Sequence, residues 1–145
     1  MGYMFEECNN FNSDLSKWNV SNVKKMQRMF RKCVIFNSDL SKWDVSNVED
    51  MSNLFDSCYN FNSDLSNWDV SNVTSMFAMF CGYNFNLNIS NWDVSNVTDM
   101  KKMFESCKNF NCDLSKWDVS NVKDMSWMFI WCPKFNSDLI KWDVS

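Results

Sequence analysis

Hydrophobic and polar positions follow two different periods inside a segment of 25 residues that recurs along the whole chain. Numbered from its first phenylalanine, this unit has the pattern F-N-S-D-L-S-K-W-D-V-S-N-V-x-x-M-x-x-M-F-x-x-C-x-x. Units begin at residues 11, 36, 61, 85, 110 and 135, and partial units occupy 1–10 and 135–145. We therefore predict a single repeat domain over residues 1–145, because a fixed period of this length is the signature of stacked repeats.

The two periods predict two elements per unit. Trp43 and Val45 alternate with polar residues as in a short strand, and Leu40 enters the core from the preceding turn. Unit positions 13, 16, 19, 20 and 23 are mostly Val, Met, Met, Phe and Cys, which is the stripe of an amphipathic helix of about three turns. An aspartate three residues after the repeat asparagine, as in Asn47 and Asp50, resembles a capping box.

These elements predict an α/β repeat solenoid. Each unit would be a short parallel strand, a turn and a short helix, in a leucine-rich-repeat-like stack. The Met and Phe columns would form the core, and two further columns would act as structural ladders, with the asparagines buried and bonded to turn backbone groups. The ladder residues are Trp18, Trp43, Trp68, Trp92, Trp117 and Trp142 at unit position 8, and Asn22, Asn47, Asn72, Asn96 and Asn121 at unit position 12.

Seven cysteines, five of them at unit position 23, fall mainly on the apolar stripe, where a free thiol behaves as a small hydrophobic group. The odd number and the absence of C-x-x-C pairs argue against a disulfide framework and against a zinc site. A reduced core column indicates synthesis in a reducing compartment. No signal peptide is visible at the start of the sequence.

Two surfaces are candidate binding sites. Unit positions 7, 9 and 11 face outward from the predicted strands, giving either a solvated, self-neutralising face or a concave recognition surface. Its charged members include Lys17, Lys42, Asp44, Asp69, Asp93, Lys116, Asp118 and Lys141. The second surface is apolar and comprises Trp127, Ile130, Trp131 and Ile140, where other units carry polar residues. It would either bind a partner or pack beneath a further segment.

Composition narrows the classes of function. The chain has a net charge of −4 with no basic stripe, so we expect no nucleic-acid partner. No apolar run has the length of a membrane span. The chain has no histidine, no Gly-rich phosphate loop and no Gly-rich calcium loop. We therefore expect no enzyme activity, no metal and no cofactor.

The segment MFRKCVIFNSDLSKWDVSNV at 29–48 resembles the repeat of bacterial surface proteins and mycoplasma lipoproteins of unknown function. It is similar, more distantly, to BspA-type leucine-rich repeats, whose A-F-x-x-C-x-x-L pattern corresponds here to M-F-x-x-C-x-x-F. The resemblance implies a horseshoe with an inner parallel sheet and a location at the cell surface, and it implies no activity. The thiol-rich core points instead to a reducing compartment, and both alternatives remain open here.

The sequence favours a non-enzymatic protein–protein interaction module that binds through the concave face or the apolar patch. The alternative is a structural spacer or surface array whose function is self-stacking. The two ends of the chain stand at unit positions 16 and 11. Head-to-tail stacking of two copies would therefore nearly complete one unit.

Overall fold

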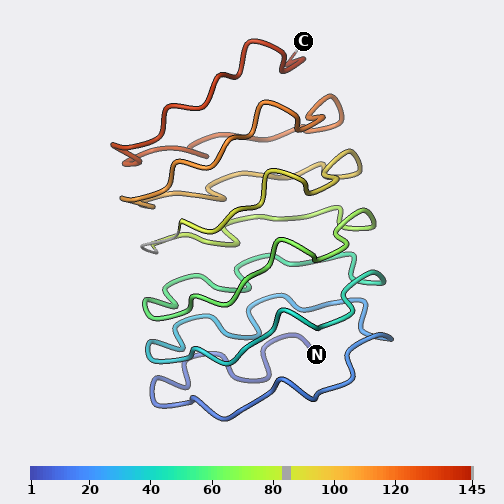
Figure 1. Ribbon diagram of the computed structural model, residues 1–145, viewed down its shortest axis with the longest axis vertical. Helices are drawn as coiled ribbons and strands as arrows, with labels where there is room; N and C mark the ends of the chain where they lie inside the picture. Colours follow the sequence, from blue (N-terminus) through green and yellow to red (C-terminus); the bar gives the residue numbers. More distant parts are fainter. Residues whose placement is uncertain (83–85, 145) are drawn as a thin grey trace.

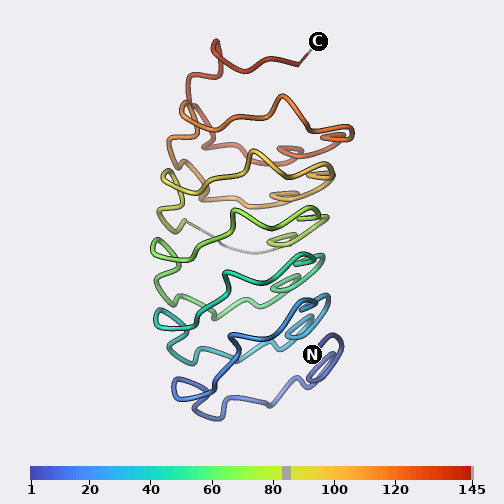
Figure 2. The same ribbon diagram turned by 90° about the vertical axis from the view of Figure 1, so that its right-hand side faces the viewer.

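The computed structural model describes residues 1–82 and 86–144. The chain runs through it as a stack of rungs, one repeat unit to a rung, and the two termini lie near opposite ends of the stack (Figure 1). The view turned by 90° shows the same rungs stacked along the long axis (Figure 2). The predicted unit start at Phe85 and the predicted domain boundary at Ser145 lie outside the described residues.

The predicted α/β repeat solenoid is wrong, because no described residue lies in a helix or an extended strand. The regular pairing in this part of the chain consists of isolated parallel bridges between successive rungs. They join Lys25 to Asp50, Asp50 to Ser75, Ser75 to Asp99, and Asp99 to Asp124. The inner parallel sheet that the resemblance implied is therefore not found in residues 1–82 and 86–144.

Two consecutive tight turns replace the predicted helix. In the first, the Met29 N–H donates to the Met26 carbonyl at 3.1 Å, and the third residue, Arg28, has a φ of 56°. Lys32, third in the second turn at 30–33, has a φ of 59°. A positive φ at the third residue is the geometry of a type II turn. It recurs at unit positions 18 and 22 in Tyr3, Glu7, Asn53, Ser57, Ala78, Gly82, Lys102, Ser106, Trp127 and Trp131.

The turns bond to the neighbouring rung, which a helix could not do. The Phe30 N–H donates to the Leu54 carbonyl of the next rung at 3.2 Å, whereas a helical amide bonds four residues back within its own segment. The Phe30 and Phe55 rings are 5.8 Å apart between rungs. A helix is about 10 Å across, so one helix per rung would not fit this spacing.

Turns also replace the predicted strand. Trp43 and Val45 are buried as expected, but Trp43 ends one turn and Val45 begins the next. The Trp43 N–H donates to the Leu40 carbonyl at 3.0 Å, and the Val48 N–H donates to the Val45 carbonyl at 2.9 Å. The predicted capping box is also wrong, because Asp50 caps no helix. One of its carboxylate oxygens accepts the Ser52 N–H at 2.9 Å.

The core consists of the Met, Phe, Trp and Val columns, as the sequence predicted. Phe55 stacks on Phe61, the first residue of the next unit, with ring centroids 4.1 Å apart. It also stacks on Phe30 and Phe80, which occupy the same unit position as Phe55 in the rungs on either side, at 5.8 and 6.0 Å. The fully buried aromatic column therefore links the rungs through continuous ring contacts.

Side-chain ladders complete the contacts between rungs. The Trp68 indole N–H donates to the Leu40 carbonyl of the preceding rung at 3.0 Å. The amide of Asn72 donates to the Ser46 carbonyl at 2.8 Å. The asparagines bond backbone groups as predicted but are exposed, so the prediction that they are buried is wrong. The same bonds recur for Trp43, Trp92, Trp117 and Trp142, and for Asn47, Asn96 and Asn121.

Replacing Asn72 with alanine is expected to lower the free energy of unfolding by about 1 kcal/mol, because one inter-rung hydrogen bond is lost. Urea unfolding measures the change. Asn22→Ala is the matched control, since no carbonyl partner for the Asn22 amide is found in the described residues. Equal losses in the two variants would show that the inter-rung bond is not what Asn72 contributes.

Candidate functional site: the variable edge

The differences between rungs gather at one edge of the stack, which we call the variable edge. It consists of unit positions 17, 18, 21 and 22, the corners of the two tight turns. Their side chains are half-buried or exposed, apart from the buried Asn53 and Ala78 at position 18. At position 18 alone the residues are Tyr3, Arg28, Asn53, Ala78, Lys102 and Trp127. Since most other positions hardly change, this edge is one of the places where a rung can be told from its neighbours.

An aromatic patch, defined as Trp127, Ile130 and Trp131, occupies the last part of the variable edge. Trp127 and Trp131 are 58 % and 67 % exposed, and Ile130 is half-buried. In the predicted helix, the two tryptophans, four residues apart, would share one face. They instead occupy the left-handed corners of successive turns, at φ of 61° and 58°. The Lys102 ammonium lies 4.5 Å from the Trp127 ring centre, within the range of a cation–π contact.

Charged side chains occupy the first part of the variable edge and pair across three rungs. Arg31 lies between two carboxylates, 2.9 Å from Glu6 and 3.1 Å from Asp56. Lys32 and Glu7 form a second, more exposed pair at 2.6 Å. This network was not predicted from the sequence. The signal was present, because Glu6, Arg31 and Asp56 alternate in sign at intervals of 25 residues.

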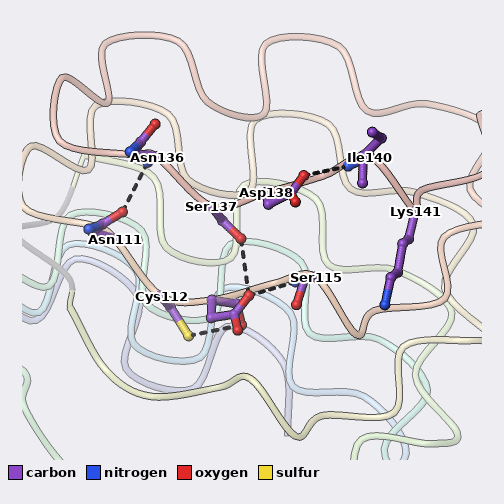
Figure 3. A pocket seen from close by; sticks show the side chains of 9 residues that line it. Asn111, Cys112, Ser115, Asn136, Ser137, Asp138, Ile140 and Lys141 are labelled. Atoms are coloured by element: carbon purple, nitrogen blue, oxygen red, sulfur yellow. Dashed lines mark hydrogen bonds between the residues drawn. The ribbon is translucent and has the colours of Figure 1, made fainter.

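Ile140, the fourth predicted patch residue, lies on a different surface. It is 86 % exposed at unit position 6 and lines a shallow polar hollow of about 430 Å³ (Figure 3). Figure 3 shows a ladder within this hollow, in which the Asn136 N–H donates to the Asn111 side chain at 2.9 Å. This ladder at unit position 2 was not predicted. The structure therefore does not bring Ile140 together with the two tryptophans.

The predicted polar columns are exposed, but no sheet lies behind them in the described part of the chain. Asp44 accepts hydrogen bonds from the Ser46 hydroxyl at 2.6 Å and the Ser46 N–H at 3.1 Å. These bonds lower its pKa, as they do for Asp118 with Ser120. The position 9 aspartates therefore stabilise local turns. The charge of Lys42 acts instead on Asp39, whose pKa is lowered first by the Ser41 N–H and only lastly by the lysine.

Stability is expected to fall in acid because the native state holds these carboxylates ionised. The pKa of Asp14, Asp39 and Asp113 lies below the ordinary 3.8, chiefly because each accepts the N–H of the serine two residues on. A lowered native pKa stabilises the fold above 3.8, and this contribution is lost as the pH falls through the native values. Urea midpoints measured down through this range check the prediction, and a constant midpoint would contradict it.

The cysteine column lies in the core at Cys33, Cys58 and Cys107, as predicted, and all seven thiols are free. The Cys58 thiol donates to the Phe30 carbonyl of the preceding rung at 2.8 Å. Burial raises the pKa of Cys33 from 9.0 to about 11 and that of Cys81 to about 12. Because the native state holds these thiols neutral, they stabilise the fold fully below pH 9.0. This contribution is expected to be lost as the pH rises through the native values, so the free energy of unfolding falls in alkali.

Two other kinds of feature, a metal site and a membrane-spanning helix, are not found among the described residues. In the described part of the chain, no three His, Cys, Asp or Glu side chains are grouped so that they could hold a metal ion. Among the same residues there is no helix long and apolar enough to cross a membrane.

These features define a class of protein, a repeat protein whose turn-built rungs are joined by hydrogen-bond ladders and carry one variable edge. The chain belongs to the DUF285 family, described as Mycoplasma protein of unknown function, whose family model matches residues 1–84 and 66–145. The match supports the mycoplasma-type repeat resemblance and does not extend to BspA-type leucine-rich repeats. No curated protein and no solved structure matches the chain.

Proposed function

We propose that the protein is a non-enzymatic protein–protein interaction module that binds its partner through the aromatic patch. The observation that carries the proposal is the exposure of Trp127 and Trp131 on an edge where the rungs differ from one another. Tryptophans are enriched among the residues that dominate binding energy at protein interfaces. A patch of exposed apolar side chains rimmed by lysines has the composition of such a site.

The polar columns at unit positions 7 and 9 support the proposal by contrast. Their residues hardly vary from rung to rung, and Asp44 and Asp118 are engaged in their own turns. A surface that repeats itself at every rung offers equivalent sites to a ligand and no unique position. The variable edge has a unique sequence at each rung, so a partner would find one register on it.

The test is affinity capture from a native extract, comparing the intact chain with the double variant Trp127→Asn/Trp131→Ser. Asparagine and serine already occupy these unit positions at Asn53 and Ser57, with the same positive φ, so the variant is expected to fold. Tyr59→Ser is the matched control, because Tyr59 is an exposed aromatic residue outside the edge. A partner retained by the control and lost by the double variant is the expected result. Equal capture by all three chains would contradict the proposal.

A second candidate function, self-stacking into an array, is favoured by complementary faces at the first and last described rungs. Amides at unit positions 18, 20 and 22 donate to carbonyls at 17, 19 and 21 of the next rung throughout the stack. In the described residues, no acceptor is found for the amides of Trp127, Phe129 and Trp131. No donor is found there for the carbonyls of Gly2, Met4 and Glu6.

A second copy placed in register would supply these bonds and would stack its Phe5 on Phe129, as Phe5 stacks on Phe30 within the chain at 5.8 Å. Sedimentation velocity over a range of concentrations tests this candidate. Self-stacking predicts elongated species that grow with concentration. A monomer at every concentration would exclude head-to-tail association and leave the interaction module as the better account.

A further inference from the structure

The charge of the variable edge differs between its two halves when the neighbouring unit positions 14–25 are included. Residues 24–35 carry five basic side chains, and the flanking segments 1–10 and 49–60 together carry five acidic ones. Ion pairs such as Lys24 with Glu49 at 3.1 Å and Arg31 with Asp56 at 3.1 Å join these rungs. The first half of the edge is therefore neutralised within the chain.

The second half keeps an excess of positive charge around the aromatic patch. Residues 98–109 and 123–134 carry five lysines and three acidic residues, on a chain whose net charge is −4. Two of these lysines are paired, Lys101 with Asp124 at 3.5 Å and Lys102 with Glu105 at 3.1 Å. The other three, Lys108, Lys123 and Lys134, are exposed and have no ion pair among the described residues.

From this charge and from the proposed function on which it rests, we infer that the partner is an acidic protein segment carrying aliphatic or aromatic anchors. Its apolar side chains pack on Trp127 and Trp131, and its carboxylates face the surrounding lysines. Lys102 lies at the patch, its ammonium 4.5 Å from the Trp127 ring centre and 3.1 Å from Glu105, and the three unpaired lysines remain for the partner's carboxylates. Complementary charge of this kind steers association and selects among partners.

An anionic membrane surface fits the observations less well. Recognition of acidic lipids by basic segments uses clusters of about 4–8 lysines or arginines. The excess here is smaller, and most rungs also expose an aspartate, such as Asp93 or Asp118, at unit position 9. Those carboxylates would be repelled by a lipid surface of the same sign. A single acidic segment contacts only the patch and its lysines.

Selection from a library of random linear peptides displayed on phage tests the inference. The intact chain is the bait, and Trp127→Asn/Trp131→Ser is the counter-selection chain, after urea unfolding has shown that both are folded. The expected result is enrichment of peptides rich in Asp and Glu with aliphatic or aromatic residues. One such peptide, made synthetically, should bind the double variant at least about tenfold more weakly. It should also bind Lys102→Glu/Lys123→Glu more weakly and lose affinity with added salt.

The other outcomes distinguish the acidic partner from the interaction module on which it rests. Enrichment of neutral or basic peptides would overturn the acidic partner and leave the interaction module standing. Failure of the intact chain to enrich any peptide over the double variant would count against the patch as a binding site for a linear segment, and so against this inference. In that case, loss of a captured partner by the double variant would still support the module. Co-sedimentation of the intact chain, and not of the double variant, with phosphatidylserine vesicles would overturn the inference in favour of a membrane surface.

Discussion

Replacing Phe55 with alanine is expected to lower the free energy of unfolding by about 3–5 kcal/mol. Phe55 is fully buried and contacts four aromatic rings. One, Phe30, belongs to the preceding unit, and the other three, Phe61, Trp68 and Phe80, belong to the next unit. Truncation leaves a cavity that the neighbouring rungs cannot fill, because inter-rung hydrogen bonds fix their spacing. The loss is therefore expected at the upper end for a core phenylalanine.

Urea unfolding followed by tryptophan fluorescence measures this loss. Tyr59→Ala is the matched control, an aromatic side chain of the same rung that is 52 % exposed. It is expected to change the free energy of unfolding by less than about 0.5 kcal/mol. A loss in Phe55→Ala as small as that of the control would mean that the ring column does not hold the rungs together.

Proline at two adjacent positions is expected to have opposite effects. Gln27 is the second residue of the turn at 26–29, where type II turns favour proline, and no acceptor for its N–H is found in the described residues. Gln27→Pro is therefore expected to change stability by less than about 1 kcal/mol. It also removes the buried Oε1 of Gln27, which has no hydrogen-bond partner.

Arg28→Pro is expected to cost at least about 3 kcal/mol. Arg28 has a φ of 56°, which the proline ring forbids, and its N–H donates to the Ser52 carbonyl at 2.8 Å. In the helix that the sequence predicted, both positions would be interior and both prolines would be similarly destabilising. Comparable losses in the two variants would therefore contradict the turn geometry and support the predicted helix.

The sequence predicted which side chains are buried and failed to predict the backbone that buries them. Met26, Met29, Phe30 and Cys33 are all buried, as the apolar stripe required. Two consecutive turns place these four positions inward with the same 3, 1, 3 spacing that a helix gives, so periodicity alone could not distinguish the two. The sequence also contained little sign of the left-handed corners. Among the described corner residues, Gly82 and Asn53 are of the types that favour a positive φ, whereas others, such as Arg28 and Trp127, are not.

The candidate site was predicted in part for the same reason. Trp127 and Trp131 were found because they depart from the repeat, and their exposure depends only on facing outward. Ile140 was grouped with them because it too departs from the repeat, replacing the usual serine, although it lines another surface. The cation–π contact between Lys102 and Trp127 joins two rungs at unit position 18. It could be anticipated only once that position was known to form a column.

Amides at unit positions 18, 20 and 22 of each rung bond to the next rung and not to a helix of their own, and one measurement tests this directly. Scalar coupling transmitted through a hydrogen bond, measured by NMR on isotope-labelled protein, identifies the carbonyl that accepts the Phe30 N–H. The structure predicts coupling to the Leu54 carbonyl of the next rung, whose oxygen lies 3.2 Å from the Phe30 nitrogen. Coupling to Met26, four residues back in the same unit, would show a helix and contradict the account.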